Sequence, residues 1–576
     1  YELMPYLTSL QPVTSAVYAA SGEPAGQTAV WKPGFDVNLR YFINYQLNHM
    51  YWRYFMWNFA GRQNDLQGNG EPQRGNWISG IPVIDNALLG DQSALPDEFG
   101  KGNKGHNVFY MLPLLLGIIG LLYQALYQHR SNPMRGIQQF WVVFFLFFMT
   151  GIAIVLYLNQ TPGQPRERDY AFAGSFYAFA IWIGIGVPAI GIMLRDLFKS
   201  KKQTAKTDDS ASADEPQCSK GVLMMSAAVA CVIGLIVPLQ MVSQTWDDHD
   251  RSGRYTTRDF GFNYLSSLDD NAIIFTNGDN DTFPLWYAQE VENFRPDVRV
   301  VNLSYLTTDW YANQMNHPTL GAEAIPMTAT PRDYAYERLA YNFIVPANSD
   351  SVAAIEALKN LYSSDAGIYG YPKTHYLADT KIVMPVDRKA ALERYSSGDT
   401  AIDSAYIAPY ITDIFTDMSA SSGVNQSRVL SLDMIANSVA SNWNRPTYFA
   451  TTVPNSYYLG LTPYLGASGL AYEVTPFKNS VYSVTADKSY RKIVSDYRWG
   501  GLDQPGAEKL YLDETVRRMV SSVRSGVYSV VEDLLATGDL PASAEARKVA
   551  EDHGMQAPVN RYDMARQLLD ILRTKM

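Results

Sequence analysis

Residues 221–243 read GVLMMSAAVACVIGLIVPLQMVS, a run without a single charged side chain. A helix rises about 1.5 Å per residue, so this run is long enough to cross a hydrocarbon core of about 30 Å. Three further stretches have the same property, at 107–127, 138–158 and 171–194. Because a soluble helix of this length normally keeps a polar face, the sequence predicts four membrane spans within residues 107–244.

Composition excludes some classes of protein. The 576-residue chain has a formal net charge of −10 and a pI near 5.3, which argues against a nucleic-acid partner. Its two cysteines, Cys218 and Cys231, lie in or beside an apolar run, so the large polar regions contain no disulfide, which is ordinary in a bacterial envelope protein. The chain opens at Tyr1 inside polar sequence, and we expect it to be the later part of a longer protein.

The distribution of Lys and Arg predicts the orientation of the spans, because these residues are enriched in cytoplasmic loops. The loop 195–220 carries six of them and the loop 128–137 carries two, whereas the loop 159–170 sets two arginines beside two acids. We therefore expect a multi-pass protein of the bacterial cytoplasmic (inner) membrane. Residues 1–106, 159–170 and everything after 244, including the C-terminal half in the periplasm, would then lie outside the cytoplasm.

The segment 36–62, DVNLRYFINYQLNHMYWRYFMWNFAGR, is crowded with aromatic residues but also holds Arg40, His49 and Arg53. Crossing the bilayer would bury these charges, whereas lying in the headgroup layer would leave them solvated. We expect an interfacial helix in an extracytoplasmic segment over 1–106. The alternative is a buried helix of an outer domain.

After residue 245 the sequence alternates between short strands and helices. Strands are expected at 271–278, 298–305 and 446–453, followed by GLAYEVTP (469–476), and helices at 283–292, 308–315 and 431–443. This alternation predicts an extracytoplasmic α/β domain with a largely parallel sheet over 245–505. The tail 506–576 is expected to be helical, with two helices around the turn ATGDLP (536–541) that resemble a tetratricopeptide unit. The predicted fold class is therefore mixed: an α-helical membrane region, an α/β domain and a short helical tail.

Residues 246–259, WDDHDRSGRYTTRD, place three aspartates and a histidine directly after the last span. Counting from Asp248, Asp or Ser falls at positions 1, 3, 5 and 12 with Gly253 at position 6, which is the spacing of a calcium loop. Three arginines, however, stand where a dication would bind. The alternatives are a salt-bridged collar and a polar site at the membrane surface. We expect these aspartates to pair mostly with arginines.

The loop QTPGQPRERDYAF (160–172) carries two arginines and two acids between two predicted spans. Arg166 and Arg168 suit a lipid-linked phosphate, because each guanidinium donates two hydrogen bonds at once. Glu167 and Asp169 are the candidate catalytic residues, as a general base beside that phosphate. The alternative is that these charges only anchor the loop at the interface.

NGDNDTFP (277–284) lies between a predicted strand and a predicted helix, at the edge of the sheet where ligands bind in α/β proteins. Asp279 and Asp281 are candidates for binding a cation or a sugar hydroxyl, and Asp281 or Thr282 is also the candidate N-cap. The full set of candidate substrate- or lipid-phosphate-binding residues is Arg166, Arg168, Asp247, Asp248, His249, Arg251, Asp279 and Asp281.

The remaining motifs do not indicate a catalytic or cofactor site. No zinc spacing, nucleophile elbow or phosphate loop occurs in the sequence, so no metal ligands are assigned, and a divalent cation is the one cofactor that remains a candidate. GIGVPA (184–189) mimics a dinucleotide glycine pattern, but its position inside a predicted membrane helix favours close helix packing instead.

Several of these stretches together resemble a family of multi-pass bacterial envelope proteins, which is related to the animal transmembrane protein O-mannosyltransferases of the GT-C glycosyltransferase type. The stretches are NHMYWRYFMWNFAGRQND, QTPGQPRERDYAF, WDDHDRSGRY, FTNGDNDTFPLWYAQEVE with VRVVNLS, and NRPTYFATT. GT-C enzymes take a sugar from a polyprenyl-phosphate carrier and pass it to an acceptor hydroxyl outside the cytoplasm. Their acidic catalytic residue usually lies in the first outward loop, which we expect upstream of Tyr1, so the resemblance assigns no catalytic residue in this chain.

The resemblance implies part of a membrane protein O-glycosyltransferase that transfers a sugar, with mannose expected, from polyprenyl phosphate to Ser or Thr of envelope proteins. Its partners would be membrane lipids, the polyprenyl-phosphate-linked sugar and acceptor envelope proteins. The alternative is a non-catalytic, membrane-anchored binding or assembly protein of the envelope. That alternative is motivated by the roughly 330 residues after 245 and by the tail.

Overall fold

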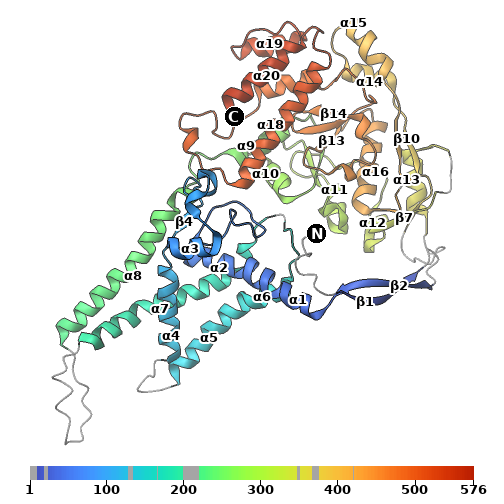
Figure 1. Cartoon of the computed structure of the whole chain (residues 1–576). Coiled ribbons are helices and arrows are strands. Elements are labelled where there is room, and N and C mark those ends of the chain that lie inside the picture. The colour runs from blue at the N-terminus through green and yellow to red at the C-terminus, as the bar shows by residue number, and fades with distance from the viewer. Residues whose placement is uncertain are drawn as a thin grey trace, which may run out of the picture. The chain divides into compact units, whose positions relative to one another are not determined.

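The computed structural model describes residues 10–18, 24–126, 134–164, 166–198, 219–346, 350–365, 375–419 and 421–576. The chain divides into two compact units, one consisting mainly of residues 27–251 and the other mainly of residues 252–576. The first unit contains the long apolar helices and the second contains the main sheet (Figure 1).

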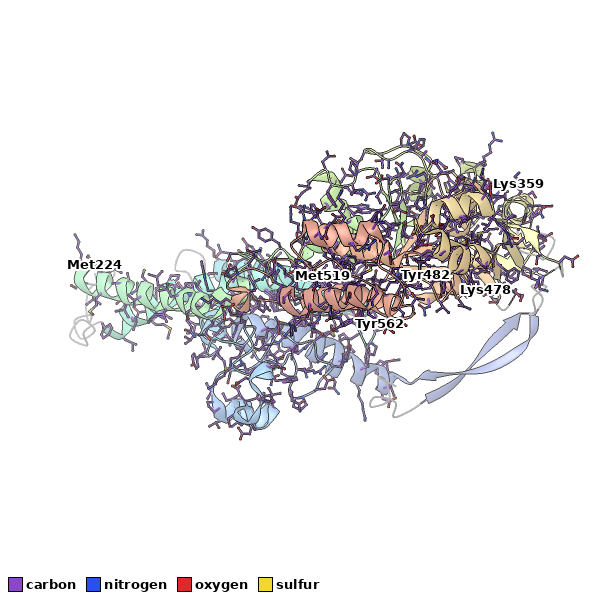
Figure 2. All side chains as sticks on the ribbon, turned by 90° about the horizontal axis from the view of Figure 1, so that it is seen from above. Met224, Lys359, Lys478, Tyr482, Met519 and Tyr562 are labelled. Carbon is purple, nitrogen blue, oxygen red and sulfur yellow. The ribbon has the colours of Figure 1, made fainter. Side chains whose placement is uncertain are left out.

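Three helical stretches of the first unit are long and apolar enough to cross a membrane: Arg135–Leu158, Asp169–Phe198 and Lys220–His249. They comprise α5 (Arg135–Thr150) with α6 (Ile152–Leu158), the 3-10 turn η5 (Asp169–Phe172) with α7 (Ala173–Phe198), and α8 (Lys220–His249). Many of their apolar side chains face outward, and Met224, which is 72% exposed, projects from α8 (Figure 2). Helices with apolar surface on this scale suit a lipid environment.

The first expected span, 107–127, forms a shorter helix than predicted. This is α4 (Leu112–Leu126), preceded by β4 (Asn107–Val108), which pairs with β3 (Gly61–Arg62). Between β4 and α4, the residues Tyr110 and Met111 have left-handed φ values of 53° and 57°, so no continuous helix runs through them. The described part of the chain therefore has three long apolar helices and one shorter one; residues 127–133 lie outside it.

Helix α7 is the centre of the first unit, because α4, α5 and α8 all pack against it. Two glycines allow the close approach of α4 and α7. A Cβ on Gly120 would lie 1.8 Å from the carbonyl oxygen of Trp182, and one on Gly186 would lie 2.3 Å from that of Leu116. Gly186 belongs to GIGVPA, so the packing role expected for this motif is confirmed at that position.

The aromatic segment forms one helical run of α1 (Phe35–Tyr41), the π-helix η2 (Phe42–Trp52) and α2 (Arg53–Phe59). Most side chains from Met50 to Phe59 are buried within the first unit, where Phe55 and Phe59 pack against Phe179 of α7. The Arg53 side chain is only 5% exposed. The expectation that Arg53 stays solvated is therefore wrong, because this part of the helix packs against protein and an ion pair takes the place of water.

The second unit is built around a five-stranded sheet of order β14-β15-β13-β5-β6. The strands β5 (Ile273–Thr276), β6 (Arg299–Asn302) and β13 (Thr447–Ala450) are parallel, as expected, and α10 (Asp279–Glu290) connects β5 to β6. The sheet is nevertheless mixed, because β15 (Ala471–Val474) runs antiparallel to β13 and forms a hairpin with β14 (Leu465–Ser468).

Further elements surround this sheet. The described residues also form the three-stranded sheets β11-β10-β8 and β12-β7-β9. Their strands are β7 (Tyr341–Ile344), β8 (Val352–Ala353), β9 (Tyr376–Leu377), β10 (Lys381–Met384), β11 (Ile414–Asp417) and β12 (Gly423–Asn425). The main helices are α9 (Thr256–Ser266), α11 (Asp309–Met315), α13 (Ala354–Ser363), α14 (Arg388–Tyr395), α16 (Gln426–Ala440) and α17 (Ala486–Ser495). The helices expected around 308–315 and 431–443 correspond to α11 and α16.

The tail 506–576 is helical, as expected, but it belongs to the second unit. It forms α18 (Glu514–Leu535), α19 (Ala544–Asp552) and α20 (Arg561–Lys575). Val527 and Leu568 are buried in the same hydrophobic core as the strand residues Ile274 and Phe449. Helix α18 packs against α20, while α19 packs against α17. The arrangement thus differs from a tetratricopeptide unit, in which consecutive helices pack against each other.

Candidate functional site

The loop between α6 and η5 is held on the helical run 35–59 by side-chain hydrogen bonds. Gln46 Nε2 donates to Asn159 Oδ1 at 2.9 Å and to the carbonyl oxygen of Gln160 at 3.0 Å, and the Tyr41 hydroxyl donates to the same carbonyl at 2.6 Å. Asn159 ends α6 in a left-handed conformation with φ of 40°. The loop backbone is therefore fixed just before its charged stretch.

Glu167 lies at the centre of this charged stretch, with donors on both of its carboxylate oxygens. Arg53 donates from Nη1 to Oε1 at 3.2 Å and from Nη2 to Oε2 at 2.8 Å. The Tyr54 hydroxyl also donates to Oε2, and the Gly68 backbone N–H lies 3.4 Å from Oε1. A forked pair of this kind is the strongest geometry an arginine makes with a carboxylate. Glu167, one of the two expected bases, is thus occupied as the counter-ion of Arg53.

The environment of Arg53 extends this cluster through aromatic rings. Its guanidinium lies 4.9 Å from the Tyr54 ring and 4.8 Å from the Trp57 ring, and the Arg62 guanidinium lies 4.2 Å from the Trp57 ring. Burial and the neighbouring Glu167 charge raise the pKa of Tyr54 well above its usual range, so its hydroxyl stays protonated as a donor. The cluster thus sets two guanidinium groups against one carboxylate.

The other charged residues of the loop form fewer hydrogen bonds and ion pairs with described residues. Arg166 is exposed, and the one hydrogen bond of its side chain to a described residue joins Nη2 to the Tyr170 hydroxyl at 3.4 Å. Arg168 is half-buried; its backbone N–H donates to Tyr54 at 3.2 Å, and its buried Nε has no partner among the described residues. Asp169 is half-buried at the start of η5, and its carboxylate has no hydrogen bond or ion pair to any described residue. Arg166, Arg168 and Asp169 therefore keep capacity for a ligand.

Arg53, Tyr54 and Arg62 were not expected at this site. The sequence feature that indicates this site is Arg53 itself, because a charged residue inside a densely aromatic helix must either remain solvated or form an ion pair. The sequence offers no rule for which acid that partner is, since Glu167 lies 114 positions away.

Asp248 belongs to the charged motif 246–259 and is buried in the final turn of α8. Its Oδ2 accepts from Asn107 Nδ2 at 2.9 Å and its Oδ1 lies 2.6 Å from His249 Nδ1, while Arg251 donates to its backbone carbonyl oxygen at 2.9 Å. Asp247, His249 and Arg251 are exposed. The carboxylate of Asp248 therefore pairs with an amide and a histidine and not with an arginine as expected, while Arg251 contacts only its backbone carbonyl.

The following arginines also find partners outside the motif. Arg254 pairs with Asp513 at 3.1 Å, and Arg258 pairs with Glu292 at 2.5 Å as well as with its neighbour Asp259 at 2.9 Å. Of the local Asp–Arg pairs expected here, Arg258–Asp259 is present, while Arg254 and Arg258 also pair with acids that are distant in sequence.

The calcium interpretation of the same motif finds no support in the geometry. Asp259 Oδ2 accepts from the Gly500 backbone N–H at 2.9 Å, and both oxygens of Asp248 are already engaged. No group of three His, Cys, Asp or Glu side chains that could hold a metal ion occurs among the described residues.

At the sheet edge, Asp281 is buried and serves the local fold. It accepts from the backbone N–H groups of Asn277 at 3.1 Å and Gly278 at 2.9 Å, and from Thr452 Oγ1 at 2.5 Å. Gly278 is the N-cap of α10, so neither Asp281 nor Thr282 is, and Asp281 instead lies in the first turn. Asp279 is exposed at the first helical position. Of this pair, only Asp279 is available to a ligand.

Comparison with known proteins gives one match. Residues 257–493 match the family model described as TMEM260-associated domain 2. No curated protein and no solved structure matches the chain. The matched region runs from α9 to α17 and contains the five-stranded sheet, so the chain is similar to this family over most of its second unit.

Proposed function

We propose that this chain is part of a membrane protein O-glycosyltransferase, which transfers a sugar from a polyprenyl-phosphate carrier to Ser or Thr hydroxyls of envelope proteins. The proposed sugar is mannose, as the family resemblance implies. In this proposal the protein lies in the cytoplasmic membrane, and the loop 159–170 and the region after 244 face the periplasm.

The observation that carries the proposal is that two arginines on the loop 159–172 form no ion pair with a described residue. This loop directly joins two helices that are long and apolar enough to span a bilayer, so its side chains lie at the level of lipid head groups. Arg166 and Arg168 have no carboxylate partner among the described residues, and Arg168 keeps a buried Nε without a hydrogen bond. A phosphate on a lipid tail matches this combination of one exposed and one half-buried guanidinium group beside apolar helices.

Roles within the site follow from these contacts. Arg166 and Arg168 bind the carrier phosphate, while the Arg53–Glu167 pair and Tyr54 hold the loop in place. Asp169 is then the acid of this loop that remains for acceptor activation. Exposed Asp247, His249 and Arg251, and Asp279 in the second unit, remain candidates for binding the substrate.

The test is sugar transfer by the full-length protein in membranes, with a radiolabelled polyprenyl-phosphate sugar and an envelope acceptor. The double substitution Arg166→Ala/Arg168→Ala is expected to lower transfer at least about 100-fold, because each charge-assisted hydrogen bond is worth about 1.5–3 kcal/mol. Arg195→Ala is the matched control, since it removes a half-buried arginine at the opposite end of α7. Unchanged transfer by the double variant at a normal protein level would overturn the proposal.

A second candidate function is a membrane-anchored binding protein of the envelope. It is favoured by a specific observation, the presence of cavities of about 610 and 930 Å³ in the second unit. Both volumes fall in the range of ligand pockets. This candidate predicts that a defined ligand binds to the full-length protein while no sugar transfer is detected.

A further inference from the structure

The second unit contains a buried group of charged side chains that the proposed transfer reaction does not use. Glu473 on β15 is fully buried. Its Oε1 accepts from Arg394 of α14 and from the Tyr395 hydroxyl, each at 3.0 Å, and Lys488 of α17 lies 3.4 Å from its Oε2. A buried carboxylate persists only when cations and donors surround it in this way.

Asp269, in the turn before β5, shares the same cations. Arg394 lies 2.8 Å from it and Lys492 lies 3.5 Å from it, and Lys488 forms a further ion pair. Burial alone would raise the pKa of Asp269, but the charges of Lys488, Lys492 and Arg394 outweigh it and hold that pKa well below the usual range. Asp269 is therefore ionised, and the network ties α14 and α17 to the main sheet.

Two cavities lie beside this network, and Asp269 and Arg394 line both of them. The smaller cavity, of about 610 Å³, is bounded by α14, α17 and the start of α19. Serine hydroxyls and two tyrosines, Tyr395 and Tyr482, contribute to its wall; Tyr482 is labelled in Figure 2. A tyrosine ring offers an apolar face and a polar tip to the same ligand.

The wall of the smaller cavity has unused hydrogen-bonding capacity of both kinds. The Nε atoms of Arg394 and Arg491 are buried without a hydrogen-bond partner among the described residues. Asp487 Oδ1 lies 3.1 Å from Arg561 Nε, but the two atoms are not aligned for a hydrogen bond, so its accepting capacity is also unused. Buried polar atoms without partners are uncommon, and a ligand that both donates and accepts would satisfy these.

The charge of the wall narrows the class of ligand. Four basic and five acidic side chains line the smaller cavity, so it favours neither a strong anion nor a cation. Hydroxyl groups both donate and accept, and the face of a sugar ring packs on aromatic side chains. We propose that this cavity binds a neutral saccharide.

This inference is independent of the proposed function. In a glycosyltransferase the site would hold a glycan on the acceptor, and in a binding protein the saccharide would be the ligand itself. Its residues are separate from Arg166 and Arg168, so binding and transfer are measured by different variants.

The experiment measures binding of free sugars to the full chain in lipid nanodiscs by isothermal titration calorimetry. Glycoside detergents are avoided during purification, because their head groups are themselves saccharides. The probes are mannose, glucose and N-acetylglucosamine with their di- and trisaccharides, and inorganic phosphate tests for an anion site. Saturable binding of at least one saccharide, with no binding of phosphate, is expected.

Two variants tie the binding to this cavity. Arg491→Ala removes an unused donor, and its exposed ion pair with Glu545 contributes little to stability. Ala544→Trp fills the cavity from an exposed position at the start of α19 without touching the charged network. Each is expected to weaken binding at least about 10-fold, while Arg573→Ala, which removes an exposed arginine of α20, leaves it unchanged. Thermal unfolding of each variant checks that it is folded.

Three results would overturn the proposal: no saturable binding of any saccharide at about 10 mM, saccharide binding that survives both cavity variants, or phosphate competing with the saccharide. Arg166→Ala/Arg168→Ala is expected to bind saccharide like the unmodified protein. Loss of sugar transfer in that variant therefore bears on the proposed function alone.

Discussion

Substitution of Glu167 by glutamine separates two roles for this side chain. If Glu167 is a general base, removing its charge abolishes the reaction and leaves the fold intact. If it is the counter-ion of a buried arginine, removing its charge destabilises the fold. The structure favours the second role, because Arg53 and Tyr54 occupy both carboxylate oxygens. We therefore expect Glu167→Gln to destabilise the first unit.

The size of the effect follows from the burial of the pair. The side chain of Arg53 is 5% exposed and that of Glu167 is 16% exposed. Removing one partner of a buried ion pair costs about 3–5 kcal/mol, because the remaining charge is left without compensation. Since Glu167 retains some exposure and glutamine still accepts one hydrogen bond, we expect the lower end, about 3 kcal/mol. That is roughly a 100-fold fall in the folding equilibrium constant.

Unfolding of the purified protein, followed by tryptophan fluorescence against temperature and denaturant, measures this change. The matched control is Asp196→Asn, which neutralises the acid of the exposed pair Arg195–Asp196 in the same unit. Exposed pairs contribute about 0–1 kcal/mol, so the control should unfold almost like the unmodified protein. If Glu167→Gln matches that control in stability but abolishes sugar transfer, the counter-ion assignment is refuted and Glu167 is the base.

Two further predictions concern pH and topology. Burial and the charge of Arg53 lower the pKa of His49 from 6.5 to about 4, so between these values the unfolded chain takes up a proton that the folded chain does not. The free energy of unfolding of the first unit should therefore fall as the pH falls from 6.5 to about 4. In denaturant titrations, His49→Gln should make this free energy less dependent on pH, and an unchanged pH dependence would contradict the assignment to His49. In a Cys218→Ser/Cys231→Ser background, a membrane-impermeant thiol reagent on intact spheroplasts should label Thr400→Cys but not Ser210→Cys, and the reverse pattern would invert the proposed orientation.

The membrane helices were predictable because their signal is local and strong. A run such as 221–243 has no alternative to a long apolar helix, and α8 contains it completely. The failure at 107–127 is also local in origin. Hydropathy cannot show that Asn107–Val108 forms a strand paired with β3 and not the first turn of a helix. It also does not indicate the left-handed residues that follow.

The parallel strands of the second unit were predictable for a similar reason, since buried runs such as 298–305 are rich in β-branched residues. The hairpin of β14 and β15 was not, because its pairing depends on contacts between strands and not on composition. The packing of the tail against the core of the main sheet was not predictable for the same physical reason. Val527 and Leu568 show only that a helix has an apolar face, and the sequence does not say which core that face joins.

The charged loop 166–169 could be singled out from the sequence, but its internal contacts could not. The partner of Glu167 lies on a helix 114 positions away, in a segment expected at the lipid surface. Electrostatic pairing across such distances in sequence follows from tertiary packing. Asp248 illustrates the same limit, since Asn107 and not an arginine holds it.

The Arg53–Glu167 pair also restricts where the chemistry of a transfer reaction takes place. If Glu167 accepted the proton of an acceptor hydroxyl, each turnover would neutralise it and leave the buried Arg53 charge without its partner. That intermediate would lie about 3 kcal/mol or more above the ion-paired state, and this amount would add to the activation barrier. Protonation of Asp169 carries no such cost, because its carboxylate has no ion pair or hydrogen bond to a described residue. Within this loop, Asp169 is therefore the candidate proton acceptor of the proposed reaction, and Glu167 contributes by keeping the loop and its arginines in position.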